Sequence, residues 1–256
     1  MPFVAAAESL RLFLGKLAAH TDLTAEQERA VLALPAAPKR IAANREIIRL
    51  GERVDYACLV AEGVVSRFAQ LEDGRRQLIT FHIAGDMANL FSLALPAAPG
   101  ALLAASATTI FQIPHGALRD LTADYPILAA ALWRDCIIDG NIVAQRLVNI
   151  GRRTARGRVA HLLCELALRY RAIGEVRDGR FPLAITQELM ADALGLTAVH
   201  VNRSLKVLRD EGLAQISRSE VQIHDWDGLV EAAEFDPDYL CLPRPDGDAR
   251  ASRGLA

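Results

Sequence analysis

Polar and cationic side chains suited to binding nucleic acid gather in residues 185–213, which run ITQELMADALGLTAVHVNRSLKVLRDEGL. Arg203 is the strongest candidate for contacting a base, because a guanidinium can donate two parallel hydrogen bonds to O6 and N7 of guanine in the major groove. A surface ion pair is the alternative role for Arg203. Thr197, His200 and Lys206 are better suited to phosphate contacts. The full set of predicted DNA-contacting residues is Thr186, Gln187, Thr197, Ala198, Val199, His200, Asn202, Arg203, Lys206 and Arg218.

Two short helices are needed to position these side chains. Thr186 predicts the cap of a helix that ends at Leu194, and Thr197 predicts the cap of a second helix that runs to about residue 211. Gly195 lies between them and permits the left-handed backbone that reverses the chain. This spacing is typical of a helix-turn-helix. The apolar residues expected to pack the two helices together are Leu189, Met190, Ala191, Leu194, Leu196, Val201, Leu205 and Leu208.

A two-stranded ribbon is expected directly after the second helix. Residues 212–216 and 221–224 resemble strands, and residues 217–220 form the turn between them. Such a ribbon is a wing, and Arg218 at its tip could reach a neighbouring phosphate. The charge agrees, since residues 151–224 hold twelve Lys and Arg against eight Asp and Glu in a chain whose net charge is −2. A basic segment of this kind favours a local phosphate-binding face, although chance asymmetry would look the same.

Residues 39–115 have the pattern of an antiparallel β-domain. Strands this short, at roughly 10-residue spacing, favour a sandwich or barrel over a parallel sheet. Asp73-Gly74 predicts a hairpin whose two central residues both take positive φ. The β-rich runs are residues 46–50, 57–60, 64–68, 77–81 and 108–113.

Residues 87–118 contain no Asp, Glu, Lys or Arg and could be mistaken for a membrane span. A spanning helix needs about 20 predominantly apolar residues, but Pro96, Pro99 and Gly100 interrupt this stretch. We therefore expect two buried strands joined by a turn at residues 96–100, and no membrane partner.

Helices are expected on both sides of the β-domain. Residues 8–34 have a helical pattern, with a capping box formed by Thr24 and Gln27. Residues 126–150 predict one long helix with Pro126 in its first turn. Its apolar residues cover more than one face, and both faces must be buried. One face would pack on the β-domain and the other on a second subunit, with a single buried helix in a monomer as the alternative.

Residue types that many catalytic and metal sites require do not cluster. Cys58, Cys136, Cys164 and Cys241 lie far apart, which excludes a zinc finger and a disulfide scaffold and predicts reduced, buried thiols. The chain has no nucleophile elbow, P-loop, dinucleotide fingerprint or HExxH sequence. We therefore predict no catalytic residues, no metal site and no enzyme. The first residues lack the features of a signal peptide, which predicts a cytoplasmic protein.

The chain as a whole resembles the Crp/Fnr superfamily of transcription regulators. The matching segments are Gly51-Glu52, residues 59–63 (LVAEG), Asp73-Gly74-Arg75, residues 81–86 (FHIAGD), residues 196–205 (LTAVHVNRSL) and residues 208–213 (LRDEGL). The resemblance implies a cyclic-nucleotide-binding-type jelly roll, a homodimer, a palindromic site on double-stranded DNA and contact with RNA polymerase. It also implies that Arg203 takes the place of the guanine-reading arginine of the family, while Ala198 and Val199 replace earlier polar contacts.

The expected fold class is therefore α+β, with an N-terminal β jelly-roll sensor domain, a long dimerisation helix and a C-terminal winged helix-turn-helix. The expected parts are residues 1–125 for the sensor, 126–150 for the dimerisation helix and 151–225 for the DNA-binding domain. A basic joint at residues 151–158 marks the start of that domain, and residues 226–256 form a partly disordered extension.

The predicted sensor departs from the nucleotide-binding members of that family. Those members hold the ribose with a glutamate and the cyclic phosphate with an arginine, but residues 97–109 contain no arginine. A partly buried phosphate without a cationic partner is costly, so we do not expect cyclic AMP to bind in the usual way. The cysteine cluster of the oxygen-sensing members is absent too, so we do not expect an iron–sulfur cluster. The candidate effector-pocket residues are Gly85, Asp86, Asn89 and Leu90.

The roles of two histidines, one cysteine and the chain as a whole each have an alternative. His82 and His115 could ligate haem or could be polar residues at strand ends. Cys58 could be a redox sensor or an inert thiol of the core. The chain could also be a ligand-binding or protein-interaction module whose DNA-binding domain no longer functions.

Overall fold

The computed structural model describes residues 6–95, 97–217 and 219–242. The chain divides into two compact units, residues 1–140 and residues 141–256. Within the described ranges, every helix is too short or too polar to serve as a bilayer-spanning segment.

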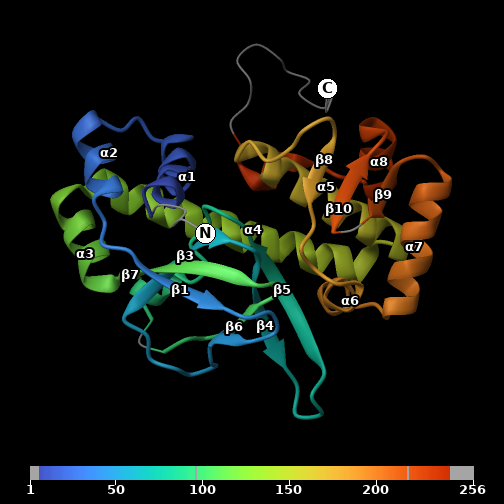
Figure 1. The fold of residues 1–256 in the computed structure, drawn as a ribbon, viewed down its shortest axis with the longest axis horizontal. Helices are drawn as coiled ribbons and strands as arrows, with labels where there is room; N and C mark the ends of the chain where they lie inside the picture. Colours follow the sequence, from blue (N-terminus) through green and yellow to red (C-terminus); the bar gives the residue numbers. More distant parts are fainter. Residues whose placement is uncertain (1–5, 96, 218, 243–256) are drawn as a thin grey trace. The chain divides into compact units, whose positions relative to one another are not determined.

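The first unit is an antiparallel β-sandwich accompanied by helices (Figure 1). One sheet has the order β1-β7-β3 and the other β2-β6-β4-β5. The α+β fold class predicted from the sequence is confirmed. The strands are β1 (Ala37–Ile41), β2 (Glu46–Ile48), β3 (Tyr56–Glu62), β4 (Val65–Gln70), β5 (Arg76–His82), β6 (Ala101–Ala104) and β7 (Thr108–Pro114). The helices are α1 (Ala6–Ala18), α2 (Ala25–Leu32), the 3-10 turn η1 (Leu90–Leu93), α3 (His115–Asp124) and the first part of α4 (Pro126–Arg152).

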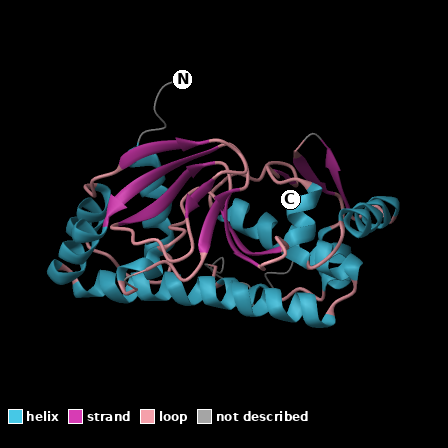
Figure 2. Ribbon diagram, turned by 90° about the horizontal axis from the view of Figure 1, so that it is seen from below, coloured by secondary structure: helices cyan, strands magenta, loops and turns pink. Residues whose placement is uncertain are grey.

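In the sheet β1-β7-β3, strand β3 is buried on both faces, whereas the edge strand β1 is mostly exposed. Cys58 and Val60 of β3 face a core that lies between the sheets, whereas Ala57 and Leu59 belong to a second core with the helices. This period of two is what a β-strand imposes on its side chains. Alternate side chains of β3 are thus buried in two different cores, so nearly every residue of the strand is apolar. Figure 2 shows helices beside strands of the sandwich.

The two β-strands expected within residues 87–118 are only partly correct. Residues 90–93 form the 3-10 turn η1, and the two strands of this stretch, β6 and β7, both follow the proline-containing segment. Asn89 promotes the turn because its carboxamide accepts a hydrogen bond from the N–H of Cys58 at 2.6 Å and donates to the carbonyl of Tyr56 at 3.0 Å. Strands β1 and β6 were not predicted. In β1, Pro38 is tolerated because β1 is an edge strand.

The predicted helix cap at Thr24 is present, whereas the predicted turn at Asp73-Gly74 has a different backbone. Thr24 and Gln27 form the expected capping box at the start of α2. Asp73-Gly74 does connect the paired strands β4 and β5. However, Gly74 alone of these two residues has positive φ, at 86°, because the N–H of Leu71 bonds to the carbonyl of Arg75 in a longer loop than a two-residue turn.

The second unit combines helices with a small antiparallel sheet of order β8-β10-β9. The predicted joint at residues 151–158 is largely helical, since α4 ends at Arg152 and Thr154 caps α5 directly after it. The sequence did not predict β8 or the two helical segments that follow β10. The elements are α5 (Ala155–Ala172), β8 (Arg180–Pro182), α6 (Gln187–Leu194), α7 (Ala198–Asp210), β9 (Ala214–Ser217), β10 (Glu220–Ile223), α8 (Trp226–Ala233) and the 3-10 turn η2 (Pro237–Leu240).

A cluster of aromatic side chains fastens the segment after β10 to α5. The ring of His161 stacks on Tyr239 at 5.9 Å between centroids and meets Phe235 edge-on at 5.0 Å. His161 is 1% exposed, and neither ring nitrogen has a hydrogen-bond partner among the described residues. Burial, together with the nearby Arg153 and Arg146, lowers the pKa of His161 to about 3.

Gly63 is expected to tolerate substitution much less than Gly51, although both have positive φ, at 82° and 77°. A Cβ on Gly63 would press on the carbonyl oxygen of Ala107 and lie 2.7 Å from Oγ1 of Thr108, whereas a Cβ on Gly51 meets nothing within 4 Å. We expect Gly63→Ala to lower the free energy of unfolding by about 1 to 2 kcal/mol more than the control Gly51→Ala. Chemical denaturation measures the difference, and equal losses would contradict this account.

Replacement of His161 by phenylalanine should flatten the acid side of the pH–stability profile. The unfolded histidine binds a proton near pH 6.5 and the folded one only near pH 3, so the free energy of unfolding falls as the pH drops through this range. His161→Phe keeps the ring contacts and removes the titration. We expect the variant to lose less stability than the parent between pH 6.5 and about 4, measured by denaturation at several pH values. Parallel profiles would refute the assignment.

Candidate nucleic-acid interface

The helices α6 and α7 form the predicted helix-turn-helix. Oγ1 of Thr186 accepts a hydrogen bond from the N–H of Leu189 at 3.2 Å, and Oγ1 of Thr197 accepts one from the N–H of His200 at 3.3 Å, so both expected caps are present. Gly195 adopts φ 60° and ψ 41°, the left-handed conformation that the sequence predicted. The caps fix where each helix begins, and the glycine fixes the direction in which α7 departs.

Arg158 of α5 stabilises the turn between α6 and α7. Its guanidinium Nη1 donates to the carbonyl of Leu194 at 3.1 Å and to that of Gly195 at 3.4 Å, while its Nε donates to the carbonyl of Arg153 at 3.0 Å. The last carbonyls of a helix have no partner within the helix. A cation at this position donates hydrogen bonds to them and interacts favourably with the negative end of the helix dipole. Arg158 was expected only as part of the basic joint at residues 151–158, because this role depends on a contact between α5 and the turn after α6.

One face of α7 is buried and the opposite face is exposed. Val201 and Leu208 are completely buried, and Ser204 is 5% exposed. The exposed residues Val199, Asn202, Arg203 and Lys206 follow at intervals of three, one and three, which places them along one side of the helix. Val199 is 69% exposed, so this side of the helix is not purely polar.

The cations of this exposed stripe are available for an external partner. Among the residues that the structure describes, no acidic side chain pairs with Arg203 or Lys206, so the ion-pair alternative for Arg203 finds no support. Other polar residues of the surface have neighbours: Asn202 donates to the carboxamide of Gln187 at 3.3 Å, and Nδ1 of His200 lies 3.2 Å from Oγ1 of Thr197. Arg203 and Lys206 therefore remain free to donate to nucleic acid.

The wing that follows α7 is present as β9 and β10, paired from Glu220↔Ser217 to Ile223↔Ala214. Strand β8 adds to its other edge, with Val221 opposite Phe181. The predicted phosphate contact at Arg218 lies outside the described residues. The remaining predicted DNA-contacting residues all belong to α6, α7 or their caps.

Comparison with known proteins agrees with this architecture. Residues 38–125 match the cyclic nucleotide-binding domain, and residues 157–232 match the Crp-like helix-turn-helix domain. The chain is similar to the transcriptional activator protein FnrL of Cereibacter sphaeroides, with 26% identity over 204 residues, or 77% of this chain and 80% of that protein. The nitrogen fixation regulation protein FixK of Azorhizobium caulinodans is 28% identical over 205 residues, or 77% and 79%. The solved structure of FixK2 from Bradyrhizobium japonicum superposes with a TM-score of 0.70 and 26% identity, over 78% of this chain and 98% of that one.

The chain belongs to the Crp/Fnr superfamily of transcription regulators. Its two matched domains lie in the order expected from the sequence, with the β-sandwich first and the helix-turn-helix second. The family is one of regulators rather than enzymes, which agrees with the lack of catalytic sequence signatures.

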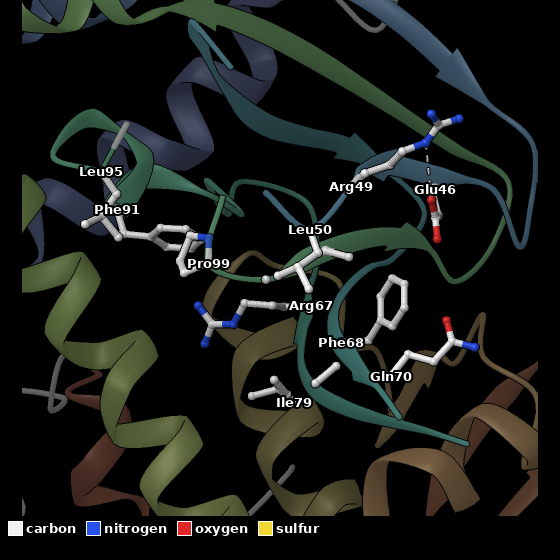
Figure 3. A pocket seen from close by; sticks show the side chains of 13 residues that line it. Glu46, Arg49, Leu50, Arg67, Phe68, Gln70, Ile79, Phe91, Leu95 and Pro99 are labelled. Atoms are coloured by element: carbon white, nitrogen blue, oxygen red, sulfur yellow. Dashed lines mark ion pairs between the residues drawn. The ribbon is translucent and has the colours of Figure 1, made fainter. Parts of the chain in front are cut away.

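The first unit (residues 1–140), the sensor unit of this Crp/Fnr protein, contains a cavity of about 610 Å³, shown in Figure 3. Its walls are mostly apolar, and Arg67 of β4 extends across it toward Phe91, with its guanidinium carbon 5.4 Å from the ring centroid. The lining residues are Glu46, Arg49, Leu50, Arg67, Phe68, Ala69, Gln70, Ile79, Phe91, Leu95, Pro99, Gly100 and Ala101.

The four residues predicted to form the effector pocket do not line this cavity. Gly85 has φ 83° and is closely packed on Leu12, and Asp86 accepts a hydrogen bond from the N–H of Ile83 at 2.7 Å and pairs with Lys16. Asn89 is bonded within its turn, as described above. These three residues support the turn, because its backbone groups need partners. Leu90 belongs to the core and lines a smaller neighbouring cavity of about 190 Å³.

The other candidate chemical groups of the sensor unit lie in buried structural environments. Nε2 of His82 lies 2.9 Å from Oγ1 of Thr80, and Nε2 of His115 lies 2.8 Å from Oγ of Ser92. Burial raises the pKa of the Cys58 thiol to about 12, so the reactive thiolate is disfavoured. No group of three or more His, Cys, Asp or Glu side chains within the described ranges is arranged to hold a metal ion.

Proposed function

We propose that this protein regulates transcription by binding a palindromic DNA site as a homodimer, with α7 of each subunit in a major groove. The observation that supports this most directly is the exposed stripe on α7, where no acidic side chain of the described residues pairs with Arg203 or Lys206, on a helix whose opposite face is buried. In this proposal Arg203 contacts a guanine. Lys206, Thr197 and His200 contact phosphates.

The apolar surface of Val199 and Ala198 has a specific use in this arrangement. Aliphatic side chains on the exposed side of a recognition helix can contact the C5-methyl group of thymine. Val199 is 69% exposed and Ala198 is half-buried. We therefore expect a thymine, rather than a hydrogen-bonding base edge, beside the guanine that Arg203 contacts.

Helix α4 supplies the proposed dimer interface. An exposed residue recurs along it at alternating intervals of three and four, which is the spacing of a coiled-coil seam. Trp133, Ile137 and Leu147 are 66%, 58% and 73% exposed, and alanine and glycine at the positions between them allow two helices to approach closely. The residues of the seam are Ala130, Trp133, Ile137, Gly140, Ala144, Leu147 and Gly151.

Two wider assignments follow from the same proposal. A dimer of this kind places its recognition helices about 34 Å apart, one turn of DNA, and acts on chromosomal DNA, so we place the protein in the cytoplasm. Contact with RNA polymerase is proposed from the family alone. The sensor unit would transmit a signal through α4, the helix that carries the seam.

Replacement of Arg203 should remove sequence preference while leaving general DNA affinity largely intact. We expect Arg203→Ala to lose about 1 to 3 kcal/mol of discrimination between selected and random DNA, because the bidentate base contact is gone. Lys206→Ala should weaken binding to all sequences and reduce its salt dependence. Selection from pooled genomic fragments followed by gel-shift titration at several salt concentrations measures both.

Arg40→Ala, an exposed arginine on β1 of the sensor unit, serves as the control and should leave both quantities unchanged. Undiminished sequence preference in Arg203→Ala would overturn the role of Arg203. No selected sequence at all with the folded parent protein would instead favour the module without a working DNA-binding domain.

A charge placed in the seam should convert the dimer to a monomer. Leu147→Asp and Ile137→Asp would bury carboxylates against the partner helix, which costs far more than an apolar contact returns. The matched control is Leu71→Asp, since Leu71 is 59% exposed on the β4–β5 hairpin and lies outside the seam. Analytical ultracentrifugation distinguishes the species, and a dimer that survives both seam substitutions would place the interface elsewhere.

A further inference from the structure

The large cavity of the sensor unit contains one cation that is incompletely paired. Nη1 of Arg67 lies 2.9 Å from Oδ2 of Asp139 in α4, and the Arg67 side chain is 15% exposed. No second hydrogen-bond acceptor faces this guanidinium within the described part of the chain, and its remaining N–H groups are not sealed from the cavity. Because a guanidinium has five donors, Arg67 can still donate two parallel hydrogen bonds to an incoming anion.

The other polar side chains of the lining are engaged at its rim. Glu46 and Arg49 pair with each other at 3.7 Å and are 46% and 82% exposed. The carboxamide of Gln70 donates to the carbonyl of Gly74 at 3.0 Å, in the hairpin loop. Figure 3 shows Arg67 lying between these groups and the ring of Phe91, so the centre of the cavity has a single charged group.

The walls around Arg67 determine what kind of anion could bind. Ile79, Phe91 and Leu95 offer apolar surface. The lining contains no hydroxyl side chain, and its carboxamide, Gln70, already donates to the carbonyl of Gly74, so it offers little to satisfy a sugar or a base edge. Asp139 is already beside the guanidinium, and the other arginine of the lining, Arg49, lies on the rim with Glu46. A doubly charged phosphate at Arg67 would therefore face a carboxylate with one nearby cation to offset it. A monoanion on an apolar body meets neither objection, and a volume of about 610 Å³ suits a small organic molecule.

Gly100 makes room for the arginine. A Cβ on Gly100 would lie 3.3 Å from Cγ and 3.4 Å from Cδ of Arg67, closer than most such contacts. The absence of a side chain at this position therefore lets the stem of Arg67 lie flat against the loop and point its guanidinium into the cavity.

We propose that this cavity binds a small carboxylic acid with an apolar, preferably aromatic, body, and that the ligand carboxylate replaces Asp139 as the partner of Arg67. The guanidinium then forms a bidentate pair with the ligand, and the ligand ring packs against Phe91. Nε2 of His82 lies 4.0 Å from Oδ1 of Asp139, so the released carboxylate keeps a polar neighbour.

The exchange removes one of the charge contacts that α4 makes within the sensor unit. Asp135 and Asp139 lie one turn apart on α4 and pair with Lys16 of α1 at 3.5 Å and with Arg67 of β4. Ligand binding breaks the second contact and leaves the first. The consequence for DNA affinity rests on the function proposed above, in which α4 carries the dimer seam, whereas the binding site itself does not depend on that function.

Isothermal titration calorimetry on the full chain without DNA tests the site, using 3-phenylpropanoate and its neutral analogue 3-phenylpropanamide. The parent protein should bind the acid about 10-fold or more tightly than the amide. Arg67→Met should abolish this preference, and Arg67→Lys should retain part of it. Arg40→Met, a control at an exposed arginine of β1 outside the cavity lining, should stay within about 2-fold of the parent. Asp139→Asn should strengthen binding of the acid about 3-fold or more, because the competing carboxylate is gone.

Equal affinity for acid and amide, no binding of either at about 5 mM, or an undiminished preference in Arg67→Met would each overturn the proposal, as would weaker binding of the acid by Asp139→Asn. Circular dichroism confirms that each variant is folded. Gel-shift titration of the same proteins is a separate measurement. Failure of the parent to bind DNA with intact calorimetry would overturn the proposed function alone.

Discussion

The left-handed turn at Gly195 is the constraint on which the DNA-binding surface depends. At φ 60° a side chain would be strained, and a Cβ would also lie 3.3 Å from Ile150. The carbonyls that the turn leaves at the end of α6 are taken by Arg158. Because both ends of the turn are fixed, α7 is oriented with Val201 and Leu208 in the core. The stripe from Val199 to Lys206 lies on the other side of the helix and is therefore exposed.

The sensor unit is organised by the double burial of strand β3. One face of β3 packs between the sheets and the other packs under the helices, so this strand has little room for polar groups. Two ion pairs join α4 to its neighbours within this unit: Arg67–Asp139 links it to β4 of the opposite sheet, and Lys16–Asp135 links it to α1. The same region contains the two cavities, which is why a ligand there and the position of α4 are physically connected.

Much of the helix-turn-helix was predictable because its signals are local. Thr186, Thr197 and Gly195 act on residues within one turn of themselves, so their roles can be inferred without knowing the rest of the fold. The long helix was predicted for the same reason, from a proline at its start and apolar residues at helical spacing. The strands β1 and β8 were missed because each has a proline and few apolar residues, and forms only by pairing with a distant strand.

The two caps, the reversing glycine and the cationic face of α7 could be predicted from residue types alone, since each depends on neighbours a few residues away. The cation that enters the sensor cavity could not be predicted in this way. The loop before β6 has no arginine, and nothing in the sequence indicates that Arg67, one strand away, fills that space beside Gly100 and pairs with Asp139. Such pairings depend on how strands and helices far apart in the chain are packed, and packing is a property of the whole fold rather than of any segment.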